Sequence, residues 1–391
     1  MQKSHNHRFF TVATMALVSN TFIATQLVAQ DSPLSQPGKP TIEMLEQIEA
    51  EDKKDDTDNN AKDRLMPGSE LDKRQTLLSS SDRIGFGAET TGGSNEVVVS
   101  NIEEFIEAVS KPNNYVLLAP SLAGQTLYIS DTVEIVAENI TIDGSDAPGA
   151  VFTPSSSFKS GRVMMYARKA NIIINNITLK ANYYPNGSSN NVGGIRFGND
   201  GIWVNNVTVS GLWDDAFDMV FSATNATFSK VKTYNTDKSI NMFYPKTSDK
   251  RISIHSSDLA GRQRNPWNQG AQYVHIWNNY IHDAQWSGPI AGLSASQYKN
   301  NNRTSPGPAN IISEYNVFEN TGSDALRTYT ESAGLLGYIH SNGDDLGGGN
   351  VIGQKNVTYT DKPSLFKIPY VYSPLPVDEV KAYVIANAGA S

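Results

Sequence analysis

The sequence predicts an all-β fold, a parallel β-helix in which short strands stack coil upon coil. Three observations predict it: short β-type runs recur, polar residues follow each run, and the interval between copies varies. The clear copies are residues 172–176 (IIINN), 202–206 (IWVNN) and 274–279 (VHIWNN), and weaker ones are 227–230, 252–256 and 311–316. When the copies are aligned on the polar residue that follows each run, this residue falls at 175, 205, about 229, about 256, 278 and about 315. The intervals are about 30, 24, 27, 22 and 37 residues.

The unit that repeats is a strand, so each strand is expected to pair with its equivalent in the next coil. Alternate side chains then point into a common core. Asn suits the bends because it tolerates left-handed backbone, and its amide can bond the same amide one coil away. Four Asn-X-Ser/Thr matches fall at such bends, so we interpret them as bend residues rather than glycosylation sites: Asn139, Asn176, Asn206 and Asn225.

Two segments precede the predicted domain. Residues 1–30 have a positive start, with Lys3 and Arg8, and an apolar run ending in small residues, the layout of a signal peptide. A membrane anchor is the alternative. Residues 31–82 are poor in aromatics, and 41–75 hold 11 acidic and 6 basic residues, so we predict a disordered tether or pro-segment with a possible short helix at 42–50. Residues 83–391 form the β-helix domain.

The ends of the predicted solenoid need caps. Residues 102–109 follow Ser100, carry Glu103 and Glu104 in the first turn, and predict an N-terminal capping helix. Residues 377–387 predict a second helix with Val380, Val384 and Ile385 on one side, placed over the last coil or across the outside.

Composition limits the possible partners. The chain has 391 residues, no cysteine and a net charge of −8. No disulfide can therefore support an exported fold, and nonspecific binding to nucleic acid is not expected. No later segment is long and apolar enough to span a membrane. We expect a secreted or periplasmic monomer.

The sequence resembles the pectate lyases, the family 1 polysaccharide lyases, from residue 84 to the C-terminus. The resemblance rests on the order of several short segments: 84–93 (IGFGAETTGG), 139–144 (NITIDG), 202–206 (IWVNN), 264–266 (RNP) followed by 275–279 (HIWNN), and 369–370 (PY) with 380–390. It implies a right-handed, single-stranded parallel β-helix. It also implies cleavage of polygalacturonate (pectate) by calcium-assisted β-elimination to unsaturated oligouronides.

The resemblance also implies roles for individual residues. Asp214 and Asp218 match an Asp pair that holds Ca²⁺, and with Asp215 they are the predicted metal ligands. Lys238 matches the lysine that contacts the substrate carboxylate, and Arg264 matches the arginine that takes the C5 proton. Residues expected to bind substrate are Arg262, Trp267 and Gln269, and further aromatics that could stack on sugars are Tyr183, Tyr184, Trp213 and Trp286.

The chain departs from the family pattern in three places. The second expected arginine is Gln269, the Asp-His pair is Asn205-Asn206, and no acidic ligand is evident on the coil before Asp214, where Asp200 is the nearest candidate. Arg262 is a possible replacement for the lost positive charge. Three alternatives therefore stay open: a lyase for another polyuronate such as alginate, a β-helix hydrolase, and a non-catalytic glycan-binding β-helix.

Overall fold

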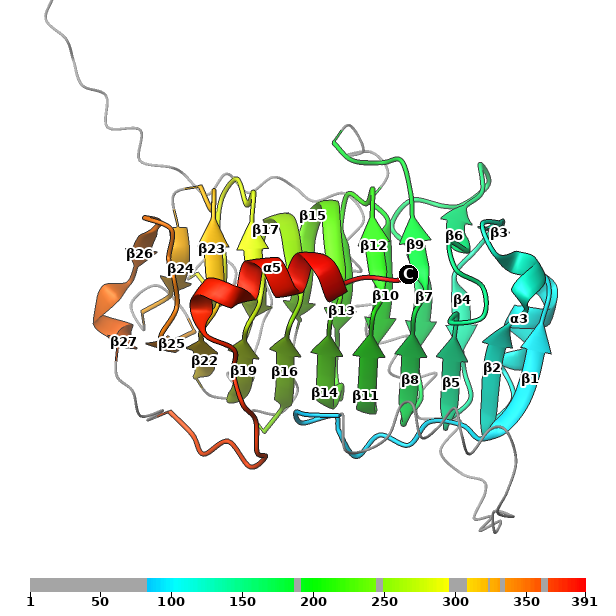
Figure 1. The fold of residues 1–391 in the computed structure, drawn as a ribbon, viewed down its shortest axis with the longest axis horizontal. Helices are drawn as coiled ribbons and strands as arrows, with labels where there is room; N and C mark the ends of the chain where they lie inside the picture. Colours follow the sequence, from blue (N-terminus) through cyan, green and yellow to red (C-terminus); the bar gives the residue numbers. More distant parts are fainter. Residues whose placement is uncertain are drawn as a thin grey trace, which may run out of the picture. The chain divides into compact units, whose positions relative to one another are not determined.

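The computed structural model describes residues 83–185, 191–243, 249–294, 308–322, 324–330, 335–359 and 365–391. The predicted signal peptide, tether and short helix at 42–50 lie outside the described residues. From residue 95 onward the chain winds into a parallel β-helix, and every strand pair is parallel (Figure 1). The predicted fold class is confirmed.

Three faces make up each coil, and we number them here. Face 1 is the 11-stranded sheet, which contains β1 (Asn95–Val99), β2 (Asn114–Leu118), β5 (Ile140–Asp143), β8 (Ile172–Asn175), β11 (Asp200–Asn205), β14 (Thr224–Ser229), β16 (Arg251–His255), β19 (Tyr273–Trp277), β22 (Ala309–Glu314), β25 (Gly337–Asn342) and β27 (Val357–Tyr359).

Faces 2 and 3 share the long bent strand β15 (Lys232–Met242), which joins them into one 16-stranded sheet. Face 2 also holds β3 (Thr126–Ile129), β6 (Val151–Pro154), β9 (Thr178–Lys180), β12 (Thr208–Ser210), β17 (Asp258–Gln263), β20 (Tyr280–His282) and β23 (Val317–Glu319). Face 3 also holds β4 (Val133–Ile135), β7 (Val163–Ala167), β10 (Gly193–Phe197), β13 (Asp215–Met219), β18 (Trp267–Asn268), β21 (Ile290–Ala291), β24 (Asp324–Thr328) and β26 (Asn350–Ile352). Two 3₁₀ turns lie at Pro120–Leu122 and Gln354–Asn356.

The core consists of rows of apolar side chains, one contributed by each coil. On face 1 the central row runs Ile142, Ile174, Val204, Phe228, Ile254 and Ile276, all fully buried and in register. Residues on either side of this row point outward. This in-and-out alternation is the two-residue period of a β-strand.

Left-handed residues form the bends after face 1, as predicted for Asn. Positive φ occurs at 176, 206, 230, 256, 278 and 315, so the sequence alignment was one residue early at its first three positions. Asn139 and Asn225, the other two glycosylation matches, also have positive φ. The predicted amide ladder is present, since Asn205 Nδ2 donates to Asn175 Oδ1 at 2.9 Å.

The N-terminal cap is the helix α3 (Ile102–Ala108). Its capping residue is Asn101, whose side chain accepts a hydrogen bond from the Glu104 amide at 2.9 Å. Ser100 lies one residue earlier and donates through its backbone amide to the Glu104 carboxylate. The side chains of Asn101 and Glu104 therefore each accept a hydrogen bond from a backbone amide at the start of the helix.

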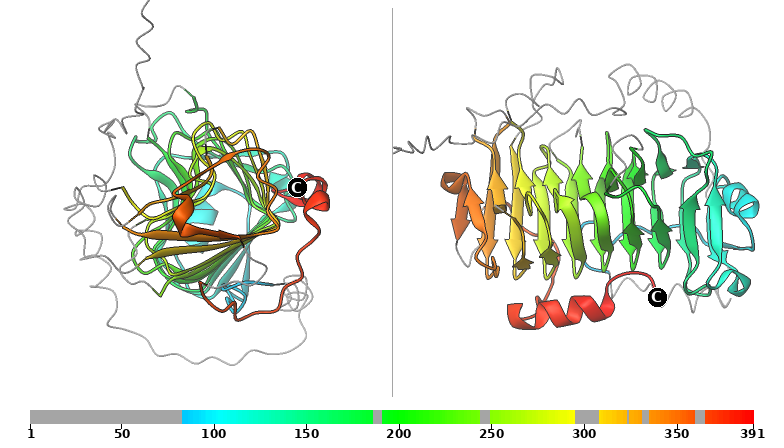
Figure 2. Two further views of the ribbon diagram at one scale, coloured as in Figure 1. Left: turned by 90° about the vertical axis from the view of Figure 1, so that its left-hand side faces the viewer. Right: turned by 90° about the horizontal axis from the view of Figure 1, so that it is seen from above.

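The C-terminal helix α5 (Val377–Asn387) lies across the outside of the stack (Figure 2). Its buried residues Val380 and Val384 pack on Tyr280 and Val317. Ile385 is 54% exposed, so the prediction that it shares the buried side was wrong. No helix among the described residues is long and apolar enough to cross a membrane.

Candidate active site

Face 3 and the adjoining end of β17 carry the predicted site residues, because stacking brings distant parts of the chain together. Asp215 of β13 pairs in register with Lys238 of β15, and Lys238 pairs with Gln263 at the end of β17. Arg264 follows directly. Residues 20 to 50 positions apart are therefore gathered on adjacent coils, as the repeat predicted.

Lys238 is the centre of this cluster and is only 1% exposed. Its Nζ lies 2.5 Å from Asp214 Oδ1, 3.0 Å from Asp237 Oδ2 and 3.9 Å from Asp215 Oδ1. Burial alone would lower the pKa of Lys238, but the surrounding carboxylates outweigh burial and raise it. Lys238 is thus a fixed, buried positive charge.

Arg264 is held in left-handed backbone, with φ +62°, and is 9% exposed. Its guanidinium carbon lies 4.1 Å from the centre of the Trp267 ring. Within the described part of the chain, its Nη1 is buried and has no hydrogen-bond partner. Burial lowers the pKa of Arg264, against the attraction of Asp215, Asp237 and Asp214. An unsatisfied buried donor costs about 1–3 kcal/mol, and a bound ligand would remove that cost.

Arg262 points to the same cluster from the other side of the turn. Its Nε donates to Asp237 Oδ1 at 2.6 Å, and its guanidinium carbon lies 5.2 Å from the Trp213 ring and 4.4 Å from the Trp286 ring. Burial would raise the pKa of Asp237, but Lys238 and Arg262 lower it to about 2. Trp286 is 48% exposed beside the cluster.

The predicted metal ligands do not gather into one site. Asp214 pairs with Lys238, whereas Asp218 pairs with Arg196 of β10 at 2.9 Å, and Arg196 and Asp218 are in register on neighbouring coils. Asp215 accepts a hydrogen bond from Asn241 at 3.3 Å, and burial, opposed by Lys238, raises its pKa to about 7. No group of three acidic or histidine side chains in the described ranges is placed to hold a metal ion.

The coil before Asp214 therefore presents a cation where the family pattern expects an acid. Asp200 does not serve, since it lies in β11 on face 1 and accepts from Asn225. Four carboxylates in the cluster face four cations: Asp214, Asp215, Asp218 and Asp237 against Arg196, Lys238, Arg262 and Arg264. Because Asp214 and Asp218 are each already ion-paired, the described residues as they stand do not fit a resident calcium ion.

Gln269 is 1% exposed and reaches the cluster indirectly. Its Nε2 donates to Asn241 Oδ1 at 2.9 Å, and Asn241 in turn donates to Asp215. Tyr184 lies on the far side of Trp213, with ring centres 5.8 Å apart, and extends the aromatic edge. Sequence reasoning missed Asp237, Arg196 and Asn241. The register between coils identifies Arg196 and Asn241, which both pair with Asp218, whereas Asp237 directly precedes Lys238 in the sequence.

Comparison with known proteins supports the fold. No family model matches the chain, and no curated protein matches it. Among solved structures, it is similar to a pectate lyase variant from Xanthomonas campestris (20% identity, TM-score 0.52, covering 79% of this chain and 98% of that one). It is also similar to a Bacillus subtilis pectate lyase variant (19%, 0.56, 78% and 96%) and to a Bacillus sp. pectate lyase in complex with trigalacturonate (18%, 0.52, 79% and 98%). The chain therefore has the parallel β-helix fold of the pectate lyases.

Proposed function

We propose that this chain is a secreted polysaccharide lyase that cleaves polygalacturonate by β-elimination. The observation that carries the proposal is the buried Arg264 guanidinium, with an unpartnered Nη1, next to the fixed charge of Lys238. Similar solved structures are described as bound to trigalacturonate and to a hexasaccharide, which supports an acidic glycan as ligand.

The proposed reaction begins at the C5 proton of a uronate unit. Arg264 in its neutral form takes this proton, and burial favours that form by lowering its pKa. The electron pair left at C5 spreads onto the adjacent carboxylate, where the buried charge of Lys238 stabilises it. The C4–O4 bond then breaks, C4 and C5 become doubly bonded, the leaving oxygen takes up a proton from water, and Arg264 returns its proton to solvent. Arg262 and Trp286 hold the neighbouring sugar.

Calcium remains a prediction from the sequence. Asp214, Asp215 and Asp218 would be its ligands, and the ion would supply further charge neutralisation at the substrate carboxylate. To bind there, it would have to replace Lys238 beside Asp214 and Arg196 beside Asp218. We therefore derive no step through calcium.

The deciding experiment follows absorbance in the unsaturated-uronate band with mature protein on polygalacturonate and on alginate. The proposal expects a rise on polygalacturonate that Arg264→Ala abolishes. Arg251→Ala is the matched control, because Arg251 lies on face 1, stacks on Tyr273 at 5.5 Å and takes no part in the cluster. A rise on alginate alone would reassign the substrate. New reducing ends without the double bond would indicate a hydrolase, and binding with no product would support a glycan-binding protein.

A further inference from the structure

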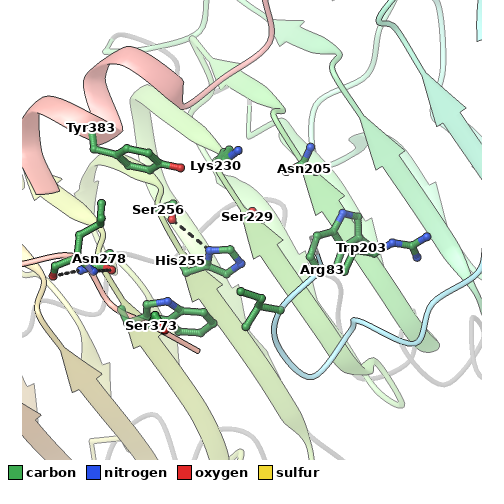
Figure 3. A pocket seen from close by; sticks show the side chains of 13 residues that line it. Arg83, Trp203, Asn205, Ser229, Lys230, His255, Ser256, Asn278, Ser373 and Tyr383 are labelled. Carbon is green, nitrogen blue, oxygen red and sulfur yellow. Dashed lines mark hydrogen bonds between the residues drawn. The ribbon is translucent and has the colours of Figure 1, made fainter. Parts of the chain in front are cut away.

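A cavity of about 390 Å³ lies on the outer surface of face 1 and shares no residue with the candidate active site. Its floor comes from the outward-facing rows of β11, β14, β16 and β19 (Figure 3). Its walls come from both ends of the described chain: Arg83 and Ile84, Ser373 and Leu375, and Tyr383 of α5. The β-helix and both ends of the described chain thus build one site.

The floor of the cavity is aromatic and uncharged. The His255 ring stacks on Trp277, with centres 4.4 Å apart and an angle of 15° between planes, and Trp203 lies on the next outward row. His255 is 8% exposed, and burial, followed by repulsion from His275 and Lys230, lowers its pKa to about 3. Trp203 and Trp277 are each only 3% exposed, and Trp277 is also stacked on His275, so these rings form a closed, rigid floor rather than an open stacking surface.

The rim of the cavity is polar and positive. The lining includes Lys230 and Arg83 but no carboxylate, and because the Arg83 guanidinium donates to the Thr90 carbonyl, Lys230 supplies the positive charge. Nothing in the described part of the chain forms an ion pair with Lys230, in contrast to Lys232, which lies 2.9 Å from Asp258. The hydroxyl of Tyr383 and the amine of Lys230 lie on the same side of the cavity, and Asn205 and Ser256 add hydrogen-bonding groups (Figure 3).

We propose that this cavity is a second binding site, on face 1, for a short acidic saccharide whose carboxylate is held by Lys230. An ammonium without an ion-pair partner in the described chain, beside a rim of hydroxyl and amide groups, complements the carboxylate and hydroxyls of a uronate better than a neutral sugar or a bare anion. The volume lies at the small end of ligand sites, which span about 300–1,000 Å³. The uronate class rests on the proposed function. The cavity and its charge stand without it.

The experiment measures binding of digalacturonate to the full chain carrying Arg264→Ala, so that neither turnover nor that arginine contributes. Calorimetry reports the affinity, and Lys230→Met is added in the same background. Lys232→Met is the control, because it removes a nearby lysine that does not line the cavity. We expect at least a tenfold loss of affinity with Lys230→Met and less than a twofold change with Lys232→Met.

Three outcomes would overturn the proposal. Equal affinity with and without Lys230→Met would show that the cavity does not hold the saccharide. Equal affinity for a galactose disaccharide would remove the carboxylate from the recognition, and tighter binding of inorganic phosphate would reassign the site to a simple anion. Lyase activity is scored separately in the otherwise native chain, where Lys230→Met is expected to leave the rate unchanged. A Lys230-dependent affinity in a protein that cleaves no polyuronate would refute the proposed function and keep this site.

Discussion

Replacing Lys238 with Met should strongly destabilise the protein. The ammonium is almost fully buried and has Asp214 at 2.5 Å and Asp237 at 3.0 Å. Removing one partner from a buried ion cluster typically costs about 3–5 kcal/mol, because the remaining charges stay desolvated and unpaired. Total stability is only about 5–15 kcal/mol. At about 2–4 °C per kcal/mol, the expected fall in Tm is about 6–20 °C.

The dependence on pH separates this mechanism from a simple packing defect. In the native chain Lys238 and Arg262 hold the pKa of Asp237 at about 2, below its ordinary 3.8. The stabilisation is therefore present above pH 3.8 and is lost as the pH falls through about 2. In Lys238→Met the carboxylates lose this partner and burial raises their pKa, so the deficit should shrink as the pH falls from neutral towards 4.

Thermal unfolding followed by circular dichroism at neutral and acidic pH is the assay. Lys232→Met is the matched control, because Lys232 is one-third exposed and its single pair with Asp258 should contribute no more than about 1 kcal/mol. The reasoning fails if Lys238→Met loses no more stability than Lys232→Met. It also fails if the deficit is the same at both pH values.

Three further predictions concern the metal, a bend and a histidine. With EGTA present, the proposed lyase should keep its rate, since its carboxylates are already paired with cations; a loss of product restored by Ca²⁺ would instead support the calcium prediction. Gly211→Ala should lower the free energy of unfolding, measured with denaturant, by about 2 kcal/mol more than Gly124→Ala does. Both glycines have positive φ, but only a Cβ on residue 211 would lie 1.7 Å from the Ala181 carbonyl oxygen. Equal losses of stability would count against this clash. His282→Gln should lower Tm at about pH 5 and not at about pH 9. Burial lowers the pKa of His282, but Asp258, at 2.8 Å, outweighs burial and raises it, so the stabilisation by the charged ring is lost as the pH rises through the raised pKa. A fall in Tm that is independent of pH would contradict this prediction.

Much of the fold was predictable because each repeat contains one strand that can be recognised in the sequence. Residues 172–176 and 202–206 are each three apolar residues followed by two Asn, and the bend there needs a residue that tolerates left-handed backbone. Helix 377–387 was predicted with its bounds. Its exposed Ile385 was assigned to the wrong side, because a short helix laid on a flat face buries only a narrow stripe.

The candidate site was predicted only in part, since a pair between coils depends on exact register. Lys238 and Arg264 were selected by their place in a family pattern, and stacking brings both to Asp214 and Asp215. The partner of Asp218 lies 22 residues earlier, a distance fixed by the length of that one coil. Because the loops between strands vary in length, the spacing between Asp218 and its partner cannot be deduced from the sequence. Arg196 was not recognised for this reason.

The C-terminal stretch has a consequence for how the stack comes apart. In most solenoids each coil touches only its neighbours, so unfolding can begin at an end and proceed one coil at a time. Here Leu375 bonds Asn278, Gly389 bonds Lys230, and Ser391 bonds Asn176, so one strap fastens coils that are about 100 residues apart in the chain. Fraying that reaches β19 from the C-terminal end must first release this strap. Amide hydrogen exchange should consequently be slowed to a similar degree from β8 to β19, with no gradient rising from the C-terminal end.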